Sequence, residues 1–180
     1  RSRTKTVYFV YSGEVMLYNL TKHGNRKVIF ILGKGRLLNQ SIVSKKPNAL
    51  FCEAACPVQV IEIAEKQFLQ LMEQSHALTR AVLREYERNL WRMGHQLKNT
   101  TGNMQMERKI AAKLWKLGRD FGVDTEDGVM IDIDLTITLM ADLVGAPREN
   151  VSRACKVLTD RGLICYGNKR FILIDFDGLA

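Results

Sequence analysis

The sequence lacks long hydrophobic runs. No apolar stretch reaches the ~18 residues that a membrane-spanning helix needs, and no segment resembles a secretory signal. These absences argue against a membrane association and predict a cytoplasmic protein. An initiator Met is also absent, and strand-like sequence begins almost at once. We therefore expect upstream residues that supply the first strands of the N-terminal domain.

Cysteine is scarce, and its spacing is uninformative. Cys52, Cys56, Cys155 and Cys165 form neither a C-x-x-C pair nor a zinc-site spacing. We interpret them as small buried thiols in a reducing cytoplasm, with a redox pair of Cys52 and Cys56 as the alternative. The chain also lacks a nucleophile–base pair, and Gly33-Lys34-Gly35 fits a turn better than a phosphate-binding loop. We predict no metal site and no enzymatic activity.

Positive charge is in excess. The 27 Lys and Arg residues outnumber the 19 Asp and Glu residues, which gives a net charge of +8. Such a balance favours a polyanionic partner through non-specific attraction, although many basic proteins bind no nucleic acid. The placement of the charge therefore matters more than its sum.

The N-terminal part of the chain alternates between apolar and polar residues. Short runs of this kind, separated by Gly and Asn turns, predict a β-barrel or jelly roll. The expected strands are Val7–Tyr11, Glu14–Tyr18, Val28–Leu32 and Val58–Ile63. From Glu65 the period becomes helical, and a short helix around Phe68 is expected.

A long helix is predicted from about Leu78 to Gln105. Its apolar positions recur at alternating steps of three and four residues, namely Leu83, Tyr86, Leu90, Met93, Leu97, Thr100 and Met104. The other faces are polar and carry Arg84, Glu85, Glu87, Arg88, Asn89, Arg92, Gln96 and Lys98. A narrow apolar seam on a polar helix is typical of a two-stranded coiled coil and predicts a homodimer. A helix packed along its own barrel is the alternative.

The C-terminal part begins with another amphipathic helix. It is expected over Ile110–Leu117 and ends at Gly118 or Gly122, and a strand over Val129–Asp134 follows a turn. The remaining residues, up to the C-terminus, carry the most specific pattern in the chain.

Two short helices are predicted between Thr136 and Ile164. Gly145 separates them, at the corner where a helix-turn-helix needs a residue that tolerates positive φ. Pro147 opens the second helix, where the missing N–H has no partner to lose. This helix buries Val151, Ala154, Cys155 and Leu158. The pattern predicts a helix-turn-helix.

The other face of the second helix carries Arg148, Glu149, Ser152, Arg153 and Lys156. Arg pairs with guanine O6 and N7, and Glu accepts from cytosine N4, so the first four residues suit base reading. An i,i+4 ion pair of Glu149 with Arg153 on a solvated helix is the alternative. A β-hairpin with a basic tip is expected over Cys165–Ile174, which makes a winged helix and predicts DNA binding.

With these features the sequence resembles the Crp-Fnr family of bacterial transcription regulators over nearly its whole length. The order is a cyclic-nucleotide-binding-like β-roll, a dimerisation helix and a winged helix. The family's recognition helix carries an R-E-x-x-x-R or E-x-x-S-R signature, and Arg148-Glu149-Asn150-Val151-Ser152-Arg153 satisfies both. The resemblance implies that Glu149 and Arg153 read C·G and G·C pairs of a shared half-site core, with Arg148 at a further guanine. A dimer would read a palindrome with half-sites about one helical turn apart.

The resemblance also implies phosphate contacts. Thr138, Asn150 and Lys156 stand where relatives touch phosphates, and Lys169 belongs to the basic tip of the hairpin. These contacts position the protein on the duplex without specifying its sequence.

The effector segments depart from those of the cyclic-AMP receptors in the family. Those receptors bind the nucleotide through G-E-L and R-S-A segments, which align here with Leu38-Asn39-Gln40-Ser41 and Asn48-Ala49-Leu50. Because no Arg faces a phosphate, cyclic AMP is not expected. Iron–sulfur binding is not supported, since Ile61 occupies the last cysteine position of the oxygen-sensing branch. Haem is not supported by His76 or His95 either.

The effector and the cofactor therefore stay unidentified. An apolar small molecule against Tyr11, Phe51, Leu90 and Met93 fits the residues better, as in the halo-aromatic-sensing branch. The candidate effector pocket comprises Asn39, Gln40, Asn48, Ala49, Phe51, Leu90 and Met93.

The sequence thus predicts an α+β protein with an N-terminal jelly-roll domain (1–75), a dimerisation helix (76–105) and a winged helix-turn-helix domain (106–180). Its expected function is effector-responsive, sequence-specific transcription regulation. The alternative is a ligand-independent DNA-binding dimer whose roll is only a scaffold. Expected partners are double-stranded DNA, a second copy of the chain, RNA polymerase and a small-molecule effector.

Overall fold

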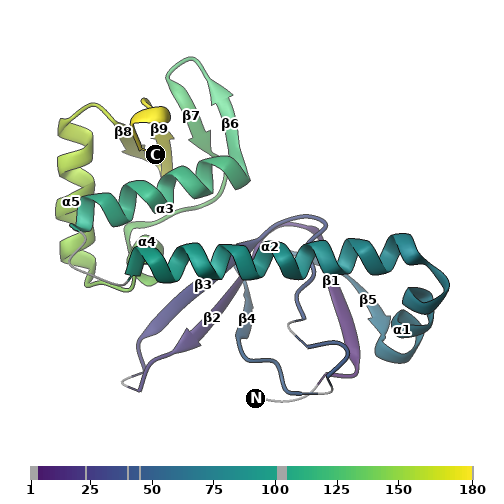
Figure 1. Cartoon of the computed structure of the whole chain (residues 1–180). Helices are drawn as coiled ribbons and strands as arrows, with labels where there is room; N and C mark the ends of the chain where they lie inside the picture. Colours follow the sequence, from purple (N-terminus) through teal and green to yellow (C-terminus); the bar gives the residue numbers. More distant parts are fainter. Residues whose placement is uncertain (1–3, 23, 40, 45, 101–104, 180) are drawn as a thin grey trace. The chain divides into compact units, whose positions relative to one another are not determined.

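The computed structural model describes residues 4–22, 24–39, 41–44, 46–100 and 105–179. The chain forms two compact units: Arg1–Asn25 with Ile29–Leu97, and Arg26–Val28 with Lys98–Ala180. Helices and strands are present in both, which confirms the predicted α+β class (Figure 1). Within the described residues, no helix is both long and apolar enough to cross a membrane.

The first unit is built on two small antiparallel sheets. β1 (Thr6–Ser12) pairs with β5 (Gln59–Ala64), and its other edge bonds to the segment around Leu37. The second sheet has the order β3-β2-β4, formed by β3 (Arg26–Leu32), β2 (Val15–Leu20) and β4 (Phe51–Ala54). The two sheets do not close, so the described strands form an open, incomplete roll, as the sequence predicts. β4 was not predicted, because its four residues are all exposed and show no alternation.

The core of the first unit lies in two clusters. Val10, Val15, Leu17, Phe30, Leu32 and Leu38 make one cluster among the strands. Val7, Leu37, Ile42, Phe68 and Val82 make the other, in which α1 (Glu65–Gln74) and α2 (His76–Thr100) pack on β1. Ser75 separates the helices, and its hydroxyl accepts from the Leu78 N–H at 3.2 Å, which caps the start of α2.

The second unit is a three-helix core with a four-stranded sheet. Its helices are α3 (Met106–Phe121), α4 (Ile137–Val144) and α5 (Arg148–Asp160). The sheet order is β6-β7-β9-β8, from β6 (Gly122–Thr125), β7 (Gly128–Ile131), β9 (Arg170–Leu173) and β8 (Ile164–Gly167), and a 3-10 turn (Asp177–Leu179) follows (Figure 1). The most deeply buried side chains include Ile110, Leu114, Leu135, Met140, Val151, Phe171 and Leu173.

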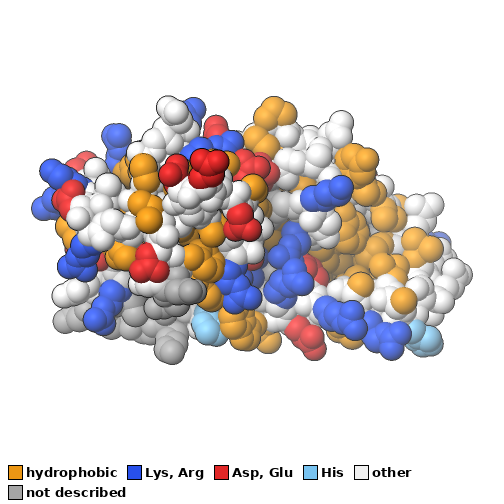
Figure 2. Space-filling view, turned by 90° about the horizontal axis from the view of Figure 1, so that it is seen from above, with side chains coloured by type: hydrophobic (Ala, Val, Ile, Leu, Met, Phe, Trp, Pro, Cys, Tyr) orange, Lys and Arg blue, Asp and Glu red, His pale blue; other side chains and the backbone are white. Residues whose placement is uncertain are grey.

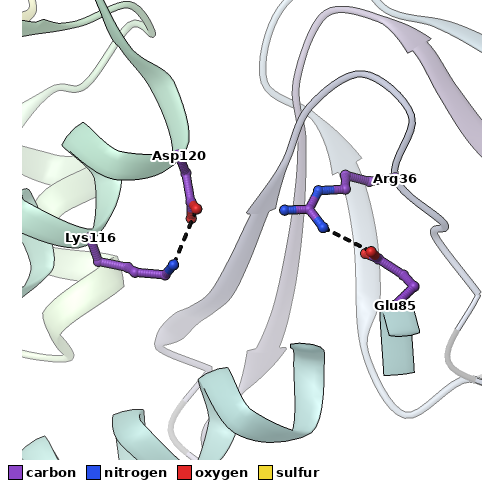
Figure 3. Close-up of polar contacts among 4 residues, drawn as sticks. All are labelled: Arg36, Glu85, Lys116 and Asp120. Carbon is purple, nitrogen blue, oxygen red and sulfur yellow. Dashed lines mark hydrogen bonds and ion pairs between the residues drawn. The ribbon is translucent and has the colours of Figure 1, made fainter. Parts of the chain in front are cut away.

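Local details of this unit refine the sequence predictions. The first helix, α3, continues through Gly118, which is buried against Leu173 and Phe176, and ends before Gly122, one of the two predicted ends. An i,i+4 ion pair, Lys116 Nζ to Asp120 Oδ1 at 3.2 Å, lies along the same stretch of α3 (Figure 3). The strand expected over Val129–Asp134 stops at Ile131, and β6 had no strand signal in its four exposed residues.

Candidate nucleic-acid interface

The turn between α4 and α5 is built from local backbone chemistry. The Thr136 hydroxyl caps α4 by accepting from the Leu139 N–H at 3.1 Å. α4 ends at Gly145, whose φ of 77° is left-handed and whose N–H bonds to the Ala141 carbonyl at 2.7 Å. Pro147 stands immediately before α5, as its fixed φ favours. The predicted helix-turn-helix is confirmed.

One face of α5 anchors the helix in the second unit. Val151, Ala154, Cys155 and Leu158 are all buried, as the sequence predicted, and α5 packs on both α3 and α4. This packing fixes which residues can reach outward.

The opposite face of α5 is exposed. Arg148, Glu149, Ser152, Arg153 and Lys156 are all solvent-accessible, and Thr138 is exposed on α4. Figure 2 shows Lys and Arg side chains, with a few acidic ones among them, over the part of the second unit where Figure 1 draws α5. The first turns of α5 thus present donors and an acceptor with nothing packed over them.

Arg153 is held by Asn150 and not by Glu149, its partner in the alternative i,i+4 ion pair. Its Nη2 donates to Asn150 Oδ1, one turn earlier on the same helix. Asn150 is half-buried, so its amide lies between the helix surface and solvent. Among its described contacts, Arg153 therefore has a hydrogen bond to Asn150 in place of the ion pair that the alternative interpretation gave.

The predicted hairpin after α5 is confirmed as β8 and β9. Its two-residue turn has positive φ at Asn168 (50°) and Lys169 (60°), the geometry of a tight hairpin turn. The Tyr166 and Phe171 rings lie 4.4 Å apart and stiffen the hairpin. Lys169 is exposed at the tip. The unit is a winged helix-turn-helix.

The predicted seam on α2 divides into two groups. Leu83, Leu90 and Leu97 follow one another at steps of seven residues and are 55%, 72% and 64% exposed. Met93 is also exposed, whereas Tyr86 is half-buried against the second core cluster and its hydroxyl bonds to the Asn39 carbonyl at 3.5 Å. Met104 lies outside the described residues. The leucine row remains open to a partner.

A polar stripe on α2 contacts the strands of the first unit. Arg36 Nη1 lies 2.8 Å from Glu85 Oε2, with both side chains largely buried (Figure 3). The Arg92 guanidinium lies 5.0 Å above the Phe30 ring. The sequence had assigned both Glu85 and Arg92 to solvated faces. The alternative from the sequence, a helix packed along its own barrel, therefore holds for this stripe, while the leucine row is exposed.

The described candidate effector residues differ in their burial and in their partners. Asn39 is buried, and its amide accepts from the Tyr8 N–H and donates to Thr4 and Thr6, which gives it a structural role on β1. Phe51 stacks on Tyr18 at 5.5 Å. Gln40 lies outside the described residues, and Asn48 is half-buried. Ala49, Tyr11, Leu90 and Met93 are exposed.

The cysteines are less uniform than predicted. Only Cys155 is buried; Cys52 and Cys165 are exposed, and Cys56 is intermediate. All four are free thiols, and the Cys56 thiol donates to Glu14 Oε2 at 2.9 Å. Cys52 and Cys56 are thus not disulfide-bonded. Among the described residues, no group of three or more His, Cys, Asp and Glu side chains is placed to hold a metal ion.

Family models match both units. Residues 2–75 match the cyclic nucleotide-binding domain, and residues 108–180 match the Crp-like helix-turn-helix domain. The chain belongs to the Crp-Fnr family. It is a Crp-like transcription regulator with a helix-turn-helix DNA-binding domain.

Curated relatives and a solved structure agree with this assignment. The chain is 25% identical to the cAMP-activated global transcriptional regulator CRP of Haemophilus influenzae, over 93% of this chain and 75% of that protein. It is 24% identical to the global nitrogen regulator of a Nostoc species, over 91% and 74%. The structure of FixK2 from Bradyrhizobium japonicum matches with a TM-score of 0.82 and 21% identity, over 99% of this chain and 87% of that one.

Proposed function

We propose that this chain is an effector-responsive regulator that binds palindromic DNA as a homodimer. The observation that carries the proposal is the exposed face of α5, where Arg148, Glu149 and Arg153 stand in the first turns of the recognition helix. Ser152 completes the base-reading set. Lys156, Thr138, Asn150 and Lys169 are proposed to contact phosphates. We assign no catalytic residue and expect the protein to act in the cytoplasm, with RNA polymerase as a further partner.

The homodimer is proposed on the leucine row of α2. Leu83, Leu90 and Leu97 expose apolar surface at every seventh residue, which suits a parallel pair of helices. Met93 and Tyr86 would flank the contact. A twofold axis along α2 would present two copies of α5, so the target is expected to be a palindrome with half-sites about one helical turn apart.

The specificity test is a binding titration with palindromic duplexes. Fluorescence anisotropy with inverted TGTGA-like or TTGAT-like halves should give saturable binding that Arg153→Ala weakens by ~1–3 kcal/mol per half-site. The matched control is Arg161→Ala, which removes the same charge at the far end of α5. If Arg153→Ala retains full sequence discrimination, the assignment of α5 as the reading helix is wrong.

Cyclic AMP is not the proposed effector. A relative carries the words cAMP-activated in its name, but in this chain Asn48-Ala49-Leu50 offers no cation to a cyclic phosphate. Two arginines of the first unit have other partners, Arg36 with Glu85 and Arg92 with Phe30. We propose an apolar effector near Phe51, Leu90 and Met93.

A thermal-shift series distinguishes the effector hypotheses. Chlorinated phenols should raise the melting temperature, because a ligand that binds only the folded state stabilises it, whereas cyclic AMP should leave it unchanged. A shift with cyclic AMP contradicts the effector proposal. If neither class shifts melting while DNA binding is intact, the chain fits the second candidate, a ligand-independent dimer whose first unit is a scaffold.

A further inference from the structure

Two carboxylates stand exposed between β7 and the helix-turn-helix. Along Ile131–Leu135 the side chains alternate, with Ile131, Ile133 and Leu135 buried and the two aspartates between them facing outward. The Asp132 and Asp134 side chains are 57% and 59% exposed. This places two negative charges immediately before Thr136, the residue that caps α4. In a domain that binds a polyanion, uncompensated carboxylates here would oppose docking.

One arginine of the wing compensates both carboxylates. Arg170 Nη1 lies 2.7 Å from Asp132 Oδ1, and Nη2 lies 3.4 Å from Asp134 Oδ1. The planar fork of a guanidinium can serve two carboxylates at once, which a lysine ammonium does with less geometric definition. The Arg170 side chain is itself only 33% exposed. Its donors therefore point at the aspartates of its own chain.

The backbone makes a second link at the same place. The Leu135 N–H donates to the Lys169 carbonyl at 2.8 Å, and Leu135 is fully buried. Lys169 and Arg170 are neighbours at the turn of the hairpin. Two interactions thus join the tip of the wing to the segment that leads into α4. One is the backbone hydrogen bond from Leu135 to Lys169, and the other is the ion pairing of the Arg170 guanidinium with both aspartates.

From this geometry we infer that Arg170 is a positioning residue for the wing. It neutralises Asp132 and Asp134 and fixes the position of Lys169 relative to the start of α4, but it does not itself bind a phosphate. The inference rests on the proposed function, since it assigns the phosphate contact of the wing to Lys169. A positively charged residue next to Lys169 would otherwise be taken as a second phosphate contact.

The test uses three variants of the full chain: Arg170→Met, Asp132→Asn with Asp134→Asn, and all three changes together. Binding to the palindromic duplex is titrated between low and moderate salt. We expect Arg170→Met to weaken binding by about three- to ten-fold, because it uncovers two exposed carboxylates near the DNA. The triple variant should return to within about twofold of wild type, because neither an uncovered carboxylate nor its repulsion of phosphate remains.

The salt dependence separates positioning from direct contact. If Arg170 binds a phosphate, the triple variant stays weak, and its slope of log K against log salt falls in magnitude by about 0.9 per protomer, or about 1.8 for the proposed dimer. That result overturns the inference, as does wild-type affinity of Arg170→Met. If the inference is correct, the slope of the triple variant equals that of wild type. Circular-dichroism melting checks that each variant folds.

The outcome also distinguishes this inference from the proposed function. If wild type does not bind any palindromic duplex while Arg170→Met and wild type melt alike, the proposed function fails. If wild type binds and Arg153→Ala abolishes discrimination, the proposed function stands and the triple variant decides the role of Arg170 alone.

Discussion

Arg153 and Asn150 show how a single exposed side chain is restrained on α5. Their hydrogen bond restrains a long, flexible side chain on an exposed helix face, and it leaves Glu149 outside the pair. Ordering Arg153 before docking lowers the conformational entropy lost on binding. Under the proposed function, Glu149 stays available to accept from a base.

Cys155 is a second single residue with a testable property, and it lies on the buried face of α5. Burial raises the pKa of its thiol to about 11, above the ordinary value of about 8.5. Between these values the unfolded chain binds fewer protons than the folded chain, so stability falls as pH rises. At a pH below the thiol pKa of the unfolded chain, about 8.5, the buried neutral thiol makes its full contribution to the free energy of unfolding.

Substitution of Cys155 tests this pH dependence. Urea unfolding at pH 8, 9 and 10 should show a decline in the free energy of unfolding of wild type that is steeper than that of Cys155→Ala, by at most about 1.4 kcal/mol per pH unit. Cys165→Ala is the control, because that thiol is exposed; it should follow the wild-type pH dependence. Equal slopes for wild type and Cys155→Ala would show that the Cys155 thiol is not buried.

At the scale of elements, α2 and α3 each contain a glycine with a different role. A Cβ at Gly118 in α3 would stand 2.7 Å from Leu173 Cδ1 and 2.8 Å from Phe176 Cε2, so this glycine permits the helix to approach the sheet and the C-terminal turn. A Cβ at Gly94 in α2 would meet nothing within 4 Å. Glycine is thus required for close packing in α3, whereas in α2 it only lowers the stability of the helix.

The two glycines give opposite predictions on substitution. Gly118→Ala should destabilise the protein by about 1–3 kcal/mol, since overpacking outweighs the gain in helix propensity. Gly94→Ala should stabilise it by about 0.5–1 kcal/mol. Urea titrations at one protein concentration measure both. Stabilisation by Gly118→Ala would mean that α3 can move away from Leu173.

At the scale of the whole molecule, α2 presents two different faces. Its polar stripe contacts the strands through Glu85 and Arg92, whereas Leu83, Leu90 and Leu97 stay uncovered. Figure 2 also shows hydrophobic side chains exposed over this unit. The sequence assigns Leu90 and Met93 both to the dimer seam and to the effector pocket. Their exposure in the single chain favours the dimer seam, because a seam residue is covered only by the second copy.

A charge in the leucine row tests the dimer. Leu90→Lys should produce a monomer by light scattering after size exclusion, because a buried unpaired ammonium in a coiled-coil seam is costly. Its affinity for a palindrome should fall to that for a single half-site. The control Arg88→Glu changes charge on an exposed position away from the row and should remain dimeric. A dimeric Leu90→Lys would rule out this seam.

The sequence alone determined the elements whose signals are local. Gly145 with Pro147 defined the turn, the period of Val151, Ala154, Cys155 and Leu158 defined the inner face of α5, and the turn after Gly167 defined the wing. These follow from backbone conformation and periodicity, which depend on near neighbours. The strands β4 and β6 had no such signal, because their residues are exposed.

Only the tertiary structure decided which polar residues meet. Arg36 reaches Glu85 and Arg170 reaches Asp132 over long separations in the chain, and neither pairing has a periodic signature. The structure likewise showed that the Asn39 side chain bonds to the backbone of β1 and that α3 continues past Gly118. Ion pairs and hydrogen bonds form only where folding brings two side chains within about 3 Å of one another. The number of residues between them in the sequence does not predict that distance.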